Sequence, residues 1–127
     1  MLPWDLEDWL SDEGDKIVHR EAVSGIDSLT PAERLVYEVW LFDTEQRNGG
    51  VAQYFGNHGR DQWNALCLAA RIVLAPFAEF AAHVDAVVAD APDPYLAVIA
   101  SDGSLDRAYE ACQVGLISAL RKATNAV

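Results

Sequence analysis

Apolar residues recur every three or four positions along almost the whole chain, and this spacing constrains the fold more than any other feature. Such spacing places apolar side chains on one face of a helix, whereas a half-buried strand needs strict alternation. Alternating runs of β-branched residues, typical of strands, are missing. With 127 residues and 51% hydrophobic composition, the chain can bury a core of its own. We therefore predict one all-α domain over residues 1–127, a compact bundle of about five to seven helices.

Local capping signals predict where the helices begin and end. Thr30, Pro31 and Glu33 form a capping box with proline at the first helical position, so a helix should begin there and run to about Arg47. The Asn48-Gly49-Gly50 sequence should end it, because glycine adopts the left-handed conformation of a helix C-terminus. We also expect helices over about 3–12, 15–23, 61–74, 76–88 and 104–123, a short helical turn at 51–55, loops at 24–29 and 56–59, and a chain break at prolines 92 and 94.

The net charge of −11 restricts the partners that the protein can bind. A strongly negative surface repels DNA, RNA and anionic lipid, so direct nucleic-acid binding and membrane binding are disfavoured. The same field attracts basic proteins. The simplest alternative is that the acidity only keeps the protein soluble.

Cysteine usage and the N-terminus together favour a cytoplasmic protein. Cys67 and Cys112 fall on apolar helix faces, where a free cysteine behaves as a small hydrophobic residue. The N-terminus lacks the basic start and apolar run of a signal peptide. The apolar stretch 65–89 is interrupted by charged residues and by Pro76, so we interpret it as two core helices rather than a membrane span.

Sequence patterns for catalysis and for cofactors are missing. His19, His58 and His83 are far apart and share no metal-ligand spacing. The chain has no Gly-x-Ser-x-Gly elbow and no phosphate-binding loop. We therefore predict no metal, no cofactor and no enzymatic activity.

Acidic residues gather near the N-terminus, with no lysine or arginine before Lys16: Asp5, Glu7, Asp8, Asp12, Glu13 and Asp15. They could simply be the solvated face of a helix, or they could form a docking patch for a basic partner. Carboxylates three or four residues apart on a helix lie roughly 5–6 Å apart at Cβ, of the same order as neighbouring phosphates on a DNA strand. We add Glu38 and Glu45 to this candidate partner-binding set, because both are expected on the solvent side of their helix.

The segment 48–57 places polar residues beside aromatic ones in a tight turn. In the structural interpretation, the amides of Asn48 and Gln53 satisfy backbone groups at the helix end, while Tyr54 and Phe55 fill the core beneath. A small-molecule or peptide pocket built from the same residues is the alternative.

This segment resembles the hallmark of the bacterial DNA mimic protein family number nineteen and of its C-terminal-domain relatives of unknown function. The similarity is a helix ending in a Glu-x-x-Asn-Gly-Gly-like stretch, followed by a Gln-Tyr-Phe step and an Asn. The matching residues are Glu45, Asn48, Gly49, Gly50, Gln53, Tyr54, Phe55 and Asn57. The similarity covers about residues 29–74 and departs from the family at Val51, commonly aromatic, and at His58, usually a small hydroxyl residue.

The resemblance implies an all-helical fold. In the family's named member it also implies an acidic surface that occupies the DNA-binding face of a transcription factor. The mimicking acids are not part of the motif, so the resemblance assigns this role to no particular acid of this chain.

Three functions follow as hypotheses. The leading one is a non-catalytic acidic module that binds a basic protein, as a DNA mimic would. The second is an immunity-type inhibitor of a basic toxin, and the third is a small ligand-binding domain or enzyme centred on the 48–57 turn. Leu41, expected to be exposed beside Glu38 and Glu45, leaves a homodimer open.

Overall fold

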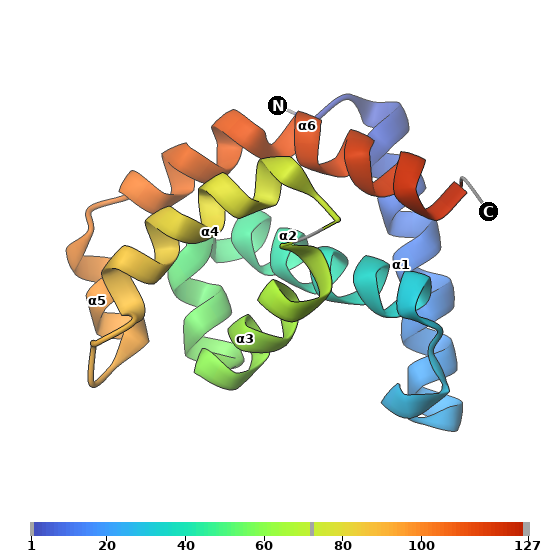
Figure 1. Ribbon diagram of the computed structural model, residues 1–127, viewed down its shortest axis with the longest axis horizontal. Helices are drawn as coiled ribbons and strands as arrows, with labels where there is room; N and C mark the ends of the chain where they lie inside the picture. Colours follow the sequence, from blue (N-terminus) through green and yellow to red (C-terminus); the bar gives the residue numbers. More distant parts are fainter. Residues whose placement is uncertain (1, 72, 126–127) are drawn as a thin grey trace.

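The structure, a computed structural model, describes residues 2–71 and 73–125. These ranges contain six α-helices and one 3₁₀ turn and no strand, which confirms the all-α prediction (Figure 1). In chain order the elements are α1 (Trp4–Ser24), η1 (Ile26–Ser28), α2 (Pro31–Asn57), α3 (Gly59–Ala70), α4 (Ala75–Val88), α5 (Pro94–Ala100) and α6 (Ser104–Asn125).

Helix α2 lies at the centre of the molecule and contacts α1, α3, α5 and α6. Figure 1 shows α4 and α6 side by side above α2. Helix α1 runs crosswise at the end of the molecule where α2 begins. None of the helices in the described ranges combines the length and the apolar character that a bilayer crossing requires. The central position of α2 means that more than one of its faces is covered.

An aromatic cluster in the core joins α2 to its neighbours. The Phe42 ring lies 4.7 Å from Tyr54, 5.0 Å from Tyr109 and 5.6 Å from Phe80, measured between ring centroids. Trp63 of α3 completes the cluster at 5.9 Å from Phe42. These rings meet in tilted or edge-on geometry, which contributes about 0.5–1.5 kcal/mol per pair beyond the burial of apolar area.

A break at Gly49 and Gly50 divides α2 into two helical segments, 31–48 and 51–57. Gly50 has φ 83° and ψ 175°, a backbone region that is essentially restricted to glycine. Side chains twelve residues apart on a straight helix would be about 18 Å apart along its axis. Here Asn57 Nδ2 lies 2.5 Å from Glu45 Oε2, because the second segment turns back beside the first. The predicted helix end at Asn48-Gly49-Gly50 is therefore confirmed as a break within α2.

The capping box at the start of α2 is also confirmed. The Glu33 amide donates to Thr30 Oγ1 at 3.1 Å, and the Thr30 amide donates to Glu33 Oε1 at 2.9 Å. This exchange satisfies two of the amide groups that a helix N-terminus leaves without a partner.

Several predicted boundaries were wrong. The two short helices expected over 3–12 and 15–23 form one continuous helix, α1. Gly14 does not interrupt it, but lies so close to the Trp40 ring that a Cβ atom would collide with the indole. The loop expected over 56–59 shrinks to a junction at His58, because α2 extends to Asn57 and α3 begins at Gly59.

The region around Pro92 and Pro94 also differs from the expectation, because Pro94 begins helix α5 instead of breaking the chain. Asp93 is its N-cap and accepts a hydrogen bond from the Leu96 amide at 3.3 Å. The Asp-Pro step is the same kind of helix-start signal as Thr30-Pro31, so the sequence contained the information needed to predict α5.

Replacing Gly50 with alanine should lower the free energy of unfolding by about 1–3 kcal/mol, because alanine disfavours this backbone conformation. The new Cβ would also lie 3.1 Å from an Asp106 carboxylate oxygen. Urea denaturation of the two proteins measures the loss. Gly115→Ala is the matched control: Gly115 lies within α6, and its new Cβ would meet nothing closer than Pro76 at 3.8 Å, so we expect a gain of about 0.5–1 kcal/mol. Equal effects at the two positions would contradict the assignment of Gly50 as the break in α2.

Candidate functional site

Four exposed aspartates form a row along the solvent face of α1, opposite its buried residues: Asp5, Asp8, Asp12 and Asp15. Their spacing of three, four and three residues keeps them on one face of the helix. The row spans about 15 Å of helix axis, or one charge per roughly 5 Å. A single DNA strand carries one phosphate per roughly 3.4 Å of rise. This aspartate row therefore has a charge spacing that approaches that of a nucleic-acid backbone.

No ion pair or hydrogen bond within the described part of the chain involves the side chains of the aspartate row. The other two acids predicted for the N-terminal patch differ in this respect. Glu7 accepts a hydrogen bond from Arg47 at 2.9 Å, and Glu13 pairs with Lys16 at 3.3 Å. Both pairs are partly or largely exposed, so each contributes little to stability. The structure thus brings four of the six acids together as free charges.

Glu38 was placed wrongly by the sequence analysis. Its side chain is completely buried, where it accepts hydrogen bonds from Arg34 Nε at 2.7 Å and from Gln62 Nε2 at 2.6 Å. Gln62 belongs to α3, which covers the side of α2 that was expected to face solvent. Leu41 was also expected to be exposed, but it is half-buried and packs against the core.

Glu45 lies at the inside of the α2 break, where its carboxylate has three neighbours, two from the second segment and one from the junction that follows it. Gln53 Nε2 donates to it at 3.2 Å, Asn57 Nδ2 donates at 2.5 Å, and His58 Nε2 lies at 3.2 Å. The expected solvent position of Glu45 was therefore wrong, since its side chain is only 15% exposed. Its contacts hold the two segments of α2 together.

The structural interpretation of the 48–57 turn is confirmed in one respect and wrong in another. Tyr54 and Phe55 are buried and fill the core beneath the turn. The amide of Gln53, however, bonds the Glu45 side chain and not the backbone at the helix end. The backbone amide at the start of the second segment, Val51 N–H, donates instead to Asp106 Oδ1 at 2.8 Å.

Two acids that the sequence analysis passed over bond the helices to one another. Asp106 of α6 also accepts a hydrogen bond from Gln46 at 3.2 Å. Asp43 is completely buried and accepts from the Tyr109 hydroxyl at 2.6 Å and from Gln113 at 2.8 Å. Burial, with the Asp43 charge beside it, raises the pKa of Tyr109 well above its usual value, so the hydroxyl stays a donor. Arg47 Nε lies 2.7 Å from Asp43 Oδ2. The spacing of four residues between Asp43 and Arg47 was the feature of the sequence that could have predicted this ion pair.

The arginines are also occupied by partners within the chain. Arg71 pairs with Asp85 at 2.9 Å, and Arg20 pairs with Glu33. Arg60 donates to two backbone carbonyls, and Arg121 lies 5.8 Å from the centre of the Trp9 ring. Buried Glu38 and Asp43 are therefore each paired with an arginine, while the row aspartates have no such partner in the described part of the chain.

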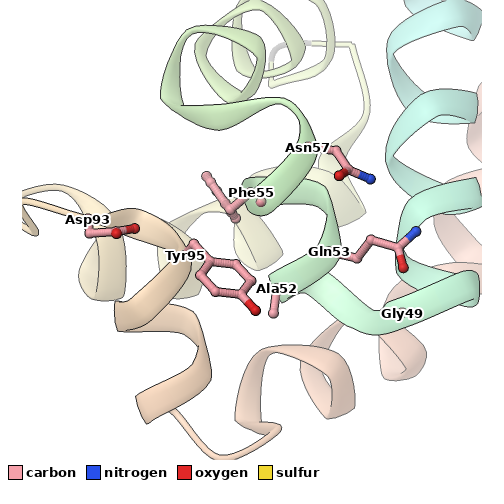
Figure 2. Close-up of a pocket in the computed structure, with 8 residues that line it drawn as sticks. Gly49, Ala52, Gln53, Phe55, Asn57, Asp93 and Tyr95 are labelled. Carbon is pink, nitrogen blue, oxygen red and sulfur yellow. The ribbon is translucent and has the colours of Figure 1, made fainter.

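A hollow of about 670 Å³ opens beside the second segment of α2 and the start of α5 (Figure 2). Gln53 and Asn57 line it together with Tyr95 of α5 and Asp93, the N-cap of that helix. Tyr54 is buried beneath and His58 faces Glu45, so neither lines the hollow. The pocket predicted as the alternative for the 48–57 turn was confined to that turn, so the contribution of α5 was not predicted.

The thiols have no activated character. Burial raises the pKa of Cys67 and of Cys112 to about 11, so both remain protonated at neutral pH. Over the described ranges, no group of three His, Cys, Asp or Glu side chains is arranged to hold a metal ion.

The model of one protein family, described as DMP19-like protein, matches residues 27–121. No curated protein matches the chain, and no solved structure does. The matched region begins after α1 ends, so it includes the α2 break with Glu45, Asp43 and Asp106, but not the aspartate row.

Neutralising free and bonded acids should have opposite effects on stability. Asp12→Asn with Asp15→Asn should leave the free energy of unfolding within about 0.5 kcal/mol of the original or raise it slightly, because repulsion along the row falls. Asp43→Asn should lower it by about 1–3 kcal/mol, because a buried ion pair is broken and an amide cannot accept all of its hydrogen bonds. Urea denaturation at low salt measures both, and a comparable loss in the two variants would mean that the row has stabilising partners.

Proposed function

This chain belongs to the DMP19-like protein family, and from that premise we propose that it is a non-catalytic acidic module that binds a basic protein by imitating DNA. Family membership supports DNA mimicry in general. The aspartate row as the imitating surface, and a DNA-binding protein as the partner, are our proposal for this chain.

The observation that carries the proposal is the row of unpaired aspartates on α1. A DNA-binding protein presents lysines and arginines at the spacing of phosphates, and these contacts dominate its affinity for DNA. Carboxylates spaced along a rigid helix offer the same cations a comparable set of partners. Because α1 is continuous over 21 residues, the four carboxylates are held at fixed spacing along one helix axis.

Electrostatic attraction of this kind should accelerate association and weaken as salt screens the charges. The bonded acids of the family-matched region contribute less to this attraction, because their charges are already compensated by donors within the fold. A basic toxin would meet the same surface, so an immunity-type inhibitor remains a second candidate. Competition with duplex DNA tests the requirement specific to mimicry, that the partner binds this chain through the surface with which it binds DNA.

We expect a variant with all four row aspartates changed to asparagine to lose at least about tenfold in capture of basic proteins from a bacterial lysate at low salt. The matched control carries the same charge change at exposed aspartates outside α1: Asp27, Asp61, Asp90 and Asp102. It should keep most of the capture, and duplex DNA should release the captured protein. Quantitative comparison of bound protein at low and high salt provides the measurement.

Equal loss in the two variants would show that only net charge matters and would remove the aspartate row as the binding surface. If the original protein captures no basic protein at low salt, the proposed function itself fails.

A further inference from the structure

The hollow beside the α2 break is shaped by a close contact between α2 and α5. A Cβ atom on Gly56 would lie 3.1 Å from the Tyr95 ring, so the ring rests against the bare backbone of α2. Tyr95 remains 40% exposed, and Figure 2 shows its ring facing the hollow, with Asp93 at the N-cap of the same helix. An aromatic face and a carboxylate thus stand on one side of the hollow.

The opposite side carries two amides whose orientation is set by Glu45. A carboxylate only accepts hydrogen bonds, so the nitrogens of Gln53 and Asn57 must be the atoms that face it, at 3.2 and 2.5 Å. The amide oxygens are therefore turned away from Glu45. Figure 2 shows the Asn57 oxygen on the side of Phe55 and Tyr95, with the nitrogen on the other side. Each amide thus has one N–H bonded to Glu45, and the Asn57 oxygen stays on the side of the hollow, whereas the Gln53 oxygen lies against Gly49.

This combination favours one class of ligand. The side chains at the hollow supply the Asn57 amide oxygen, an aromatic face, and the Asp93 carboxylate, whose Oδ1 also caps α5. A planar cation with several N–H donors satisfies all three, because it can donate to the oxygens while it stacks on the ring. A guanidinium group has this chemistry, whereas an ammonium is a compact, strongly hydrated charge that stacks less well.

We propose that the hollow binds the guanidinium of a single arginine side chain presented by the basic partner protein. The proposal rests on the proposed function for the source of the arginine. It adds a specific binding site for one side chain of the partner to the long-range electrostatic attraction of the aspartate row. Free arginine would bring a carboxylate that Asp93 repels, so an arginine within a peptide chain is the better ligand.

The probe is N-acetyl-arginine methylamide, which carries the side chain between two uncharged peptide groups. Titration into the ¹⁵N-labelled full-length protein should give saturable shifts of the Ala52 and Gly56 amides, both of which line the hollow. The citrulline analogue, equal in shape but uncharged, should give none. The lysine analogue and free arginine should each bind at least about threefold more weakly.

Variants at the hollow test the assigned groups. Tyr95→Leu should weaken binding of the arginine probe about three- to fivefold, whereas Tyr95→Phe, which keeps the ring, should retain it. Asp93→Asn should also weaken binding while an asparagine still caps α5. Asp90→Asn is the matched control, because Asp90 is an exposed aspartate that does not line the hollow. Changing the aspartate row to asparagine should leave binding of the arginine probe within twofold.

Equal shifts with the citrulline analogue, or no saturable shift with arginine, would overturn the proposal. So would shifts confined to α1, or equal weakening by Asp90→Asn and Asp93→Asn. If these results coincide with capture of a basic protein that depends on the aspartate row, the proposed function stands and only the arginine anchor is rejected. If the arginine probe binds as expected but no basic partner is captured, the hollow remains an arginine site and the proposed function fails.

Discussion

The hydrogen bond from the Val51 amide to the Asp106 carboxylate holds the break in α2, and the rest of the fold depends on that break. A helical segment that restarts leaves amide groups without partners and a partial positive charge at its N-terminus. The Asp106 carboxylate of α6, 55 residues further along the chain, accepts a hydrogen bond from one of these amides and places a negative charge beside them. With the second segment turned back, Tyr54 reaches the Phe42 ring and Phe55 reaches Trp63, which completes the aromatic core.

Two groups of acids in this protein have different physical roles. Asp43, Glu38 and Asp106 are desolvated or partly buried, and hydrogen bonds from named donors compensate for the loss of water. The aspartates on α1 keep their water and have no protein partner within the described residues. Pairing within the fold leaves the net charge unchanged, but it decides which acids a partner would meet, and four of the exposed ones lie in a row on one helix.

The turn after Gly50 combines a structural role with the chemistry of a binding site. Glu45 holds the two α2 segments together through Gln53 and Asn57, and the same bonds fix the orientation of these two amides beside the hollow. Rigid orientation of a polar group by a second residue is a common feature of binding sites. Tyr95 and Asp93 enter from α5, about forty residues further along the chain, so the hollow exists only where the two elements meet.

The sequence by itself determined the features that depend on local periodicity and capping. Helical spacing alone places the four aspartates of α1 in one row, and Thr30 with Glu33 marks the start of α2 because a capping box spans a single turn. Only the tertiary structure decided the environment of Glu38 and Glu45. Periodicity identifies the more apolar face of a helix, but α2 is surrounded by four other helices, so its polar side is covered as well. There, pairing with donors from distant segments, and not distance from the apolar face, determines which carboxylates remain available to a partner.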